Sequence, residues 1–184
     1  ITVLHCVIYI MGGQIRMKAI IYTSNTGSTA EYAQLLGKEL NLPIHSLQQA
    51  KNKVPAGSEI IYLGWIMAGG IKGYKKAAKL YKVCVVCGVG MGQTGTQLKE
   101  LRDKNTIPQR IPLFTLQGNF DVKKLRGTYR FMMNVMVKTA GKGLANKTDR
   151  TPEEDDMLDM MVNGGKRVSL QNLKAVTEWY KSLN

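Results

Sequence analysis

The fold is decided by residues 18–29, which read Lys-Ala-Ile-Ile-Tyr-Thr-Ser-Asn-Thr-Gly-Ser-Thr. The first half is a short apolar run typical of a buried strand, and the second half is a polar turn that holds a glycine. Residues 29–40 then place apolar side chains at helical spacing, with Glu31 in the first turn. A strand, a polar turn and a helix in this order predict the first βα unit of an α/β domain.

The same alternation continues along the chain. Further apolar runs predict four more strands, over 43–47, 59–64, 82–87 and 111–116. Helical spacing predicts helices over 74–81, through Leu98 and Leu101, and over 169–183. Nearly uniformly apolar strands are typical of a parallel sheet that is covered on both faces. We therefore expect a doubly wound α/β domain with a five-stranded parallel sheet and helices on both faces.

A helical segment is inserted before the last helix, over about residues 121–165. It opens with a strongly apolar helix over 129–139 and continues through a stretch rich in glycine and lysine. Thr151-Pro-Glu-Glu154 is a capping box with proline at the first helical position, and Asn163-Gly-Gly165 ends that helix. No linker or repeat interrupts the chain, so residues 17–184 are expected to form one domain.

The first sixteen residues do not fit this pattern. They begin with Ile1, and they have neither the length of a spanning helix nor the basic start of a signal peptide. Met17 directly precedes the first strand. We expect the natural protein to start at Met17, and residues 1–16 to be a mis-called or non-native leader.

The composition is that of a basic globular protein. Of its 184 residues, 44% are hydrophobic and 21% are charged, and 26 Lys and Arg against 13 Asp and Glu give a net charge of +13. This charge favours anionic partners, namely acidic proteins, nucleic acid or a membrane surface. Aromatic residues make up only 7%, which is few for a protein that binds bases by stacking. We therefore expect an acidic partner protein and no nucleic acid.

Three cysteines, an odd number, argue against a secreted disulfide framework, and the protein is expected to be cytoplasmic. Cys84 and Cys87 form a Cys-x-x-Cys motif inside the predicted strand over 82–87. Residues three apart in a strand point to opposite faces, so we expect the two sulfurs to diverge and to pack as small apolar groups. His5 and His45 are isolated, and the sequence predicts neither a metal site nor a nucleophile–base pair.

The turn after the first strand has the features of an anion site. Ligands of such sheets bind at the carboxyl ends of the strands, and a helix N-terminus binds phosphate without a cationic side chain. The residues of this turn are Ser24, Asn25, Thr26, Gly27, Ser28 and Thr29. Their pattern differs from the NTPase loop, which needs Gly-x-x-x-x-Gly-Lys. The alternative is that these side chains only cap the helix.

These residues resemble the FMN-phosphate loop of the flavodoxins. The pattern there is Ser/Thr-x-Thr-Gly-x-Thr between a strand and a helix, and Ser24, Thr26, Gly27 and Thr29 match it position for position. The resemblance covers residues 17–118 and the last helix. It implies a flavodoxin-like sheet with strand order 2-1-3-4-5 and FMN as the cofactor.

In flavodoxins two further loops hold the flavin ring, one after the third strand and one after the fourth. The resemblance places them at Trp65, Ile66, Met67, Ala68 and Gly69, and at Gly88, Val89, Gly90, Met91 and Gly92. Glycines let backbone N–H groups approach the ring edge closely. Many flavodoxins also have an aromatic residue over the ring, which would fall near Ala68. Trp65 comes earlier, either as a ring contact or as a core residue.

The basic charge and the inserted segment resemble one subgroup of this family. Gln117-Gly-Asn-Phe-Asp121, with the basic and aromatic residues up to Met133, is similar to the flavodoxin-type domain of menaquinone-dependent protoporphyrinogen dehydrogenase. That domain has an aromatic and basic cluster after the third strand, where this chain has Met67-Ala-Gly-Gly70. The resemblance therefore implies shared architecture and FMN, and it leaves the haem-pathway activity open.

Three functions are consistent with these features. The first is an FMN-binding electron carrier, in which the flavin supplies the chemistry. The second is an FMN-dependent oxidoreductase of the protoporphyrinogen dehydrogenase or quinone-reductase type, and the third is a flavin-free interaction protein. Gly90-Met-Gly-Gln-Thr-Gly95 also satisfies the dinucleotide fingerprint of NAD sites, although no clear acidic residue follows at the ribose-binding distance.

The helix over 129–139 leaves two interpretations open. Met132, Met133 and Met136 form a stripe that is flanked by basic residues, namely Lys123, Lys124, Arg126 and Arg130. Such a stripe is either core packing or a surface that contacts a membrane or a quinone. In the second case the protein would be attached peripherally to the inner face of the membrane.

Overall fold

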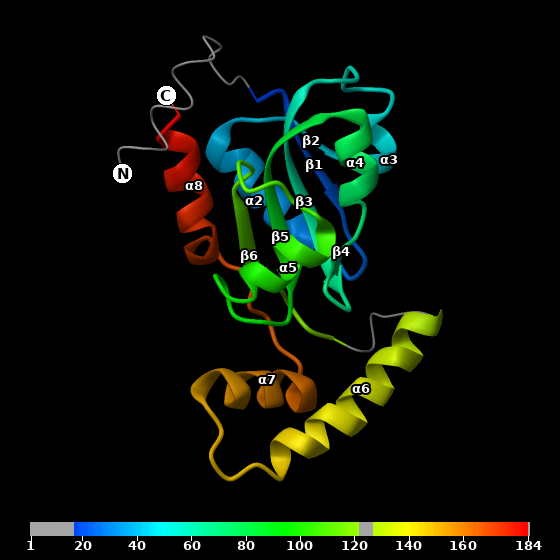
Figure 1. The fold of residues 1–184 in the computed structure, drawn as a ribbon, viewed down its shortest axis with the longest axis vertical. Helices are drawn as coiled ribbons and strands as arrows, with labels where there is room; N and C mark the ends of the chain where they lie inside the picture. Colours follow the sequence, from blue (N-terminus) through cyan, green and yellow to red (C-terminus); the bar gives the residue numbers. More distant parts are fainter. Residues whose placement is uncertain (1–16, 122–126, 184) are drawn as a thin grey trace.

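The computed structural model describes residues 17–121 and 127–183, so the leader expected over 1–16 lies outside the described chain. Five parallel strands form the central sheet (Figure 1). They are β1 (Ala19–Thr23), β2 (Ile44–Ser46), β3 (Glu59–Met67), β5 (Lys82–Gly90) and β6 (Leu113–Gln117). Their order is β2-β1-β3-β5-β6, and every neighbouring pair is parallel. Counted in chain order this is 2-1-3-4-5, so the predicted doubly wound sheet is confirmed.

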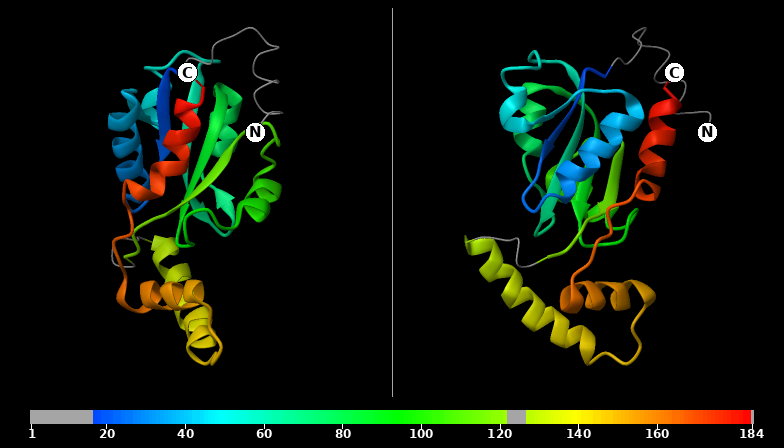
Figure 2. Two further views of the ribbon diagram at one scale, coloured as in Figure 1. Left: turned by 90° about the vertical axis from the view of Figure 1, so that its left-hand side faces the viewer. Right: turned by 180° about the vertical axis from the view of Figure 1, so that it is seen from behind.

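Helices cover both faces of this sheet (Figure 2). Alternation along β3 sends Tyr62 into the core of one face and Leu63 into the core of the other. The first face packs against α3 (Leu47–Ala50), α4 (Tyr74–Leu80) and α5 (Leu98–Asn105). The second packs against α2 (Ser28–Leu40), the 3-10 turn Gln171–Leu173 and α8 (Lys174–Lys181). The carboxyl edge of the strands is left for loops.

The third and fourth strands of the sheet are longer than predicted. β3 continues through Trp65, Ile66 and Met67 and pairs with the short antiparallel strand β4 (Gly70–Ile71), so the expected ligand loop is the tip of a β-hairpin. Residues 88–90, also expected in a loop, belong to β5. These two strands lie side by side in the sheet and pair with each other as far as Trp65 and Val89. Because of this mutual hydrogen bonding, both strands continue beyond the apolar runs that predicted them.

The prediction that Cys84 and Cys87 lie on opposite faces is wrong. The register of β3 and β5 shifts between Ile60 and Ile61, where one extra residue of β5 interrupts the alternation. Both cysteines consequently pack against the core cluster on the α2 side of the sheet. Burial raises the pKa of Cys84 to about 11 and that of Cys87 to about 12. Both thiols are free and protonated at neutral pH, and they act as packing groups.

Cys87 predicts a loss of stability at alkaline pH. Its pKa lies near 9.0 in the unfolded chain and at about 12 in the folded protein. Its contribution is complete below the unfolded pKa and is lost as the pH rises toward the folded one, because the unfolded state releases the proton first. From about pH 9.5 to 11 the free energy of unfolding in urea should fall by up to about 1.4 kcal/mol per pH unit through this group. A Cys87→Ala variant should lack that slope, and equal slopes in the two proteins would contradict the prediction.

Two helices, α6 (Gly127–Ala145) and α7 (Pro152–Asn163), form the predicted insertion and lie beyond the carboxyl edge of the sheet (Figure 1). The chain leaves and re-enters the domain at one point, where Phe120 and Gly165 exchange backbone hydrogen bonds of 2.9 and 3.0 Å. The predicted capping box begins α7, with the Thr151 side chain accepting from the backbone N–H of Glu154. Met160 of α7 is fully buried and anchors this helix to the domain.

The helix α6 carries large apolar side chains on its surface. Phe131 is 71% exposed and Val135 is 45% exposed, and the two lie one turn apart. The predicted methionine stripe rests on the side chains of Met132, Met133 and Met136, which lie outside the described part of the structure, as do residues 122–126. Within the described ranges no helix is both long and apolar enough to cross a bilayer.

Candidate functional site

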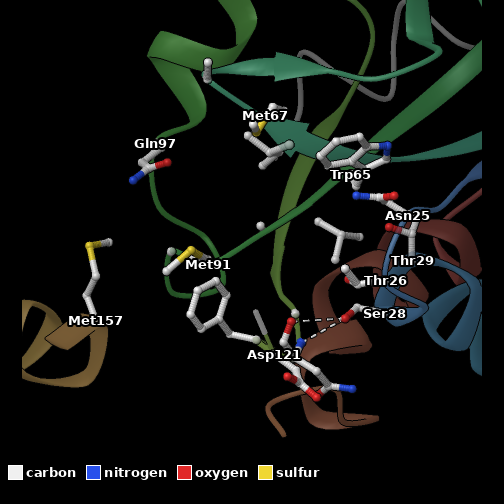
Figure 3. A pocket seen from close by; sticks show the side chains of 18 of the residues that line it. Asn25, Thr26, Ser28, Thr29, Trp65, Met67, Met91, Gln97, Asp121 and Met157 are labelled. Atoms are coloured by element: carbon white, nitrogen blue, oxygen red, sulfur yellow. Dashed lines mark hydrogen bonds between the residues drawn. The ribbon is translucent and has the colours of Figure 1, made fainter. Parts of the chain in front are cut away.

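A cavity of about 260 Å³ opens at the carboxyl edge of the sheet. Most of the predicted site residues line it, the exceptions being Ser24, Gly27, Gly69 and Gly88. In the described part of the chain its lining is Asn25, Thr26, Ser28, Thr29, Trp65, Ile66, Met67, Ala68, Val89, Gly90, Met91, Gly92, Gln97, Gly118, Asn119, Phe120, Asp121, Met157 and Met161. Polar residues of the turn gather at one end and Met157 lies at the other (Figure 3). The three predicted segments therefore meet at one site.

The polar end of the cavity is the N-terminus of α2. Gly27 holds the left-handed conformation that starts the helix, with φ of +107°, and no side chain caps the first turn. The Ser24 hydroxyl is buried and has no hydrogen-bond partner among the described residues. A buried hydroxyl without a partner is rare and calls for a bound group. An anion at this helix N-terminus would supply the acceptor.

Ser28 connects the polar turn to the segment after β6. Its side chain lines the cavity, but its hydroxyl accepts the backbone N–H of Asn119 at 3.0 Å and lies 3.3 Å from the carbonyl of Asn119 (Figure 3). A Cβ on Gly118 would come within 3.2 Å of the Ser28 Cβ, so this glycine lets the segment after β6 approach the helix. Ser28 thus ties the 118–121 segment to the polar turn.

The strand before the polar turn is fixed by a buried tyrosine. The Tyr62 hydroxyl hydrogen-bonds with Thr23 Oγ1 at 2.8 Å and with the carbonyl of Lys72 at 2.7 Å. Burial raises the pKa of Tyr62 to about 12. A Cβ on Gly73 would lie 2.2 Å from this hydroxyl, which explains the glycine at that position. Tyr62 therefore joins the end of β1 to the residues that follow the β3–β4 hairpin.

The β3–β4 hairpin turns through Ala68 and Gly69, which both have positive φ, of +47° and +71°. This is the pattern of a type I′ hairpin turn, which alanine adopts only at a cost in conformational energy. Asn105, at the end of α5, holds the turn in place. Its side-chain amide donates to the carbonyls of Gly69 and Leu101 at 2.9 and 2.8 Å and accepts the N–H of Ile71 at 2.7 Å.

Trp65 and the glycines of β5 form the walls of the cavity. Trp65 lies on β3 and lines the cavity, with the Lys72 ammonium 5.9 Å from its ring centre. A Cβ on Gly88 or Gly90 would come within 3.1 Å of Ile66 Cδ1, so both glycines serve the packing of β3 on β5. The N–H of Gly95 donates to the carbonyl and hydroxyl oxygens of Thr115 at 3.1 and 3.0 Å. This glycine of the dinucleotide fingerprint therefore holds the loop to β6 instead of facing a ligand.

Seven lining residues were not among the predicted site residues. They are Gln97, Gly118, Asn119, Phe120, Asp121, Met157 and Met161. Those over 118–121 follow β6, and their place at the carboxyl end of a strand was a signal that could have identified them. Met157 and Met161 lie on α7. No local sequence pattern indicates that the insertion folds back over the sheet.

The charges around the cavity are few. Asp121 is the one charged residue in its lining within residues 17–121 and 127–183, and the net charge of the protein is +13. An anion bound at the α2 N-terminus would thus rely on backbone N–H groups, hydroxyls and the positive field of the whole protein. The described residues contain no group of three His, Cys, Asp or Glu that could hold a metal ion. The arrangement suits a flat molecule with an anionic tail.

The comparisons with known proteins agree with this geometry. Residues 19–146 match a protein-family model described as a flavodoxin domain. No curated protein and no solved structure gave a match. The matched range covers more than half of the chain and contains the five-stranded parallel sheet, the polar turn and most of the residues that line the cavity. The chain belongs to the flavodoxin family.

Proposed function

We propose that this protein binds FMN in the cavity at the carboxyl edge and works in electron transfer. The open N-terminus of α2 carries the proposal, because Thr26 and Thr29 line the cavity there and no side chain caps the helix, which provides a phosphate site at one end of an apolar slot. Thr26 and Thr29 would bind the phosphate with the backbone N–H groups of the turn, and the buried Ser24 hydroxyl lies in the same turn. When bound, FMN supplies the transfer of electrons.

The remaining walls would orient the flavin ring. Trp65, Ile66 and Met67 lie on one side of the slot, and Gly90, Met91 and Gly92 belong to the neighbouring strand and loop. Backbone groups at the glycines can approach a ring edge closely, and apolar side chains exclude water from it. Because the hairpin is held by Asn105, its geometry is set before any ligand binds.

The experiment that tests the proposal is a titration of the purified protein with FMN and with riboflavin, followed by flavin fluorescence and absorption. FMN is expected to bind with saturation, and riboflavin, which lacks the phosphate, to bind at least about 100-fold more weakly. Equal affinities would show that the polar turn is not the anchor. A protein that binds neither compound would support the flavin-free interaction protein instead.

A second candidate function is an FMN-dependent oxidoreductase of the protoporphyrinogen dehydrogenase or quinone-reductase type. The observation that favours it is the position of α7, whose Met157 and Met161 close one side of the cavity. A pure electron carrier needs an accessible ring edge, whereas an enzyme needs a bounded site beside the ring. Turnover of a quinone by the FMN-loaded protein would distinguish the enzyme from the carrier.

We further propose that the partner is an acidic redox protein that docks on the basic side of the β3–β4 hairpin. Lys104 is exposed and packs against Gly69, and α4 adds the exposed Lys75, Lys76 and Lys79. Opposite charges would steer the two proteins together, so association should slow as the salt concentration rises. The alternative is a peripheral membrane or quinone contact through α6, where Phe131 and Val135 are exposed beside Arg130 and Lys138.

A further inference from the structure

The insertion exposes large apolar side chains on both of its helices. Helices α6 and α7 run in opposite directions and lie beyond the sheet (Figure 1). They pack against each other, and a Cβ on Gly141 would lie 3.9 Å from the sulfur of Met161. Phe131 and Val135 of α6 are 71% and 45% exposed, and Val162 of α7 is 70% exposed. These apolar groups are available to another molecule.

Exposed residues at matched spacing form one stripe on each helix. Each stripe consists of a valine and two charged residues, which lie three and seven positions from it. The stripes are Val135, Lys138 and Lys142 on α6, and Val162, Asp159 and Asp155 on α7. Residues at these spacings share one face of a helix, about 4.5 and 10.5 Å apart along its axis. The α7 stripe runs backwards along the chain, so two antiparallel helices bring each lysine opposite an aspartate when the valines meet.

Both stripes lie on the same side of the helix pair. With 3.6 residues per turn, the α6 stripe lies about a quarter turn from Gly141, and the α7 stripe about a third of a turn from Met161. Because the helices run in opposite directions, these rotations point the same way. Met160, which is fully buried against the domain, lies on the other side of α7. The two stripes together are the outer face of the insertion.

The charges of the insertion are divided between its two helices. Helix α6 contains three Lys and Arg and no Asp or Glu, whereas α7 contains five Asp and Glu and no Lys or Arg. Residues 127–163 together hold five basic and six acidic residues, although the whole protein has a net charge of +13. An anionic membrane attracts segments rich in lysine and arginine, which this balance does not provide. A face with one basic and one acidic stripe is complementary to a second copy of itself.

The aspartates of the α7 stripe each have room for a second cation. Asp155 pairs with Arg150 at 2.6 Å and Asp159 pairs with Arg167 at 3.1 Å, yet their side chains are 58% and 51% exposed. An ionised carboxylate has about four sites that accept hydrogen bonds. A lysine of another molecule can therefore bind each of them without displacing the arginine.

We infer that two copies of this chain associate through the outer face of the insertion, with α6 of each copy against α7 of the other. A twofold rotation repeats every contact, so the interface contains two Lys138–Asp159 pairs and two Lys142–Asp155 pairs. The four helices would form an antiparallel bundle. Met157 and Met161 of α7 line the cavity, so the second copy would also hold one wall of that site in place.

The test is sedimentation velocity on the full chain over a range of protein and salt concentrations. The protein is expected to be a dimer that dissociates on dilution and dissociates more readily as the salt concentration rises. Lys138→Glu and Asp159→Lys should each weaken the dimer at least about tenfold, because each change places like charges together at both symmetry-related contacts. The control Lys38→Glu makes the same substitution at an exposed residue of α2 and should leave the dimer unchanged.

An equal mixture of the two variants distinguishes this interface from any other. In a dimer of one Lys138→Glu copy and one Asp159→Lys copy, both contacts again join opposite charges, so the mixture should dimerise although neither variant does alone. Urea unfolding checks that Asp159→Lys, which loses its pair with Arg167, is folded. If it is not, Lys142→Glu and Asp155→Lys repeat the exchange.

Three results would overturn the inference. The first is a protein that stays monomeric up to about 200 µM, which would mean that the outer face has no useful affinity for itself. The second is a dimer that both single variants leave intact, since its interface would lie on another surface. The third is a monomer that binds vesicles of phosphatidylglycerol and phosphatidylcholine and loses this binding in Lys138→Glu, which would assign the outer face to a membrane.

Discussion

Replacing Thr26 with glutamate is expected to weaken FMN binding at least about 100-fold and to leave the fold intact. Thr26 lies in the turn before α2, is only half-buried and lines the cavity at its polar end. A carboxylate there would sit against the phosphate, and like charges in close contact cost several kcal/mol. Among the residues that the structure describes, the lining has no lysine or arginine to offset the added charge. Flavin fluorescence titrations of the two proteins measure the change.

Two controls separate this effect from unfolding and from loss of the ring site. Thr148→Glu makes the same substitution at an exposed residue outside the cavity and should keep the FMN affinity. Riboflavin has no phosphate, so its weak binding should be nearly the same in Thr26→Glu as in the unchanged protein. An FMN affinity within threefold of the unchanged protein would mean that the phosphate lies elsewhere.

The helices and strands that were predicted well are those whose conformation is determined by residues close to one another in the sequence. The apolar run over 18–23 and the polar turn after it are β1 and the start of α2, and Thr151 caps α7 as its sequence indicated. In these places a few neighbouring residues determine the backbone conformation, through burial, a left-handed glycine or a side-chain cap. The strand order was predicted from the resemblance to the flavodoxins, which rests on the turn at residues 24–29. No local sequence pattern indicates which strands pair with each other.

The errors arise where a tertiary contact changes a local pattern. The strand over 59–67 extends past its apolar run because β5 pairs with it as far as Trp65. The alternation of Cys84 and Cys87 fails because of one extra residue in β5, which only the register with β3 reveals. Successive side chains of a strand point to opposite faces of the sheet only while the pairing with the neighbouring strand is regular.

The α7 side of the site was beyond sequence reasoning for a similar reason. Met157 and Met161 are separated from the polar turn by more than a hundred residues, and they reach the cavity only because Phe120 and Gly165 pair at the base of the insertion. Ser28 makes a second such long-range contact. Its position in the turn predicts a phosphate contact, and the structure adds a contact that the sequence did not indicate, in which its hydroxyl accepts the backbone N–H of Asn119. Residue type and spacing identify the side chains that could bind a ligand, and the structure adds the hydrogen bonds that each hydroxyl makes within the protein.

Replacing Asn105 with leucine is expected to lower the free energy of unfolding by roughly 3 kcal/mol and the FMN affinity by about tenfold. Asn105 is 5% exposed, and its amide hydrogen-bonds with the backbones of Gly69, Ile71 and Leu101. Leucine fills a similar space but makes none of these bonds, so it leaves buried backbone groups without partners. The hairpin tip at Ala68, already strained by its positive φ, would lose its anchor. Urea unfolding and FMN titration measure the two effects.

The exchange rate of one backbone proton tests whether the hairpin is the part that loosens. The N–H of Ile71 donates to Asn105 in the unchanged protein, so its hydrogen exchange should accelerate strongly in Asn105→Leu. The N–H of Gly118, which donates to Gly90 at 2.7 Å on the other side of the cavity, should exchange faster only by the amount that the global loss of stability requires. Asn134→Leu, the same substitution at an exposed position of α6, should change the free energy of unfolding by less than about 0.5 kcal/mol. An Ile71 proton that stays as protected as that of Gly118, with FMN affinity unchanged, would show that Asn105 stabilises α5 alone and does not position the ring-binding hairpin.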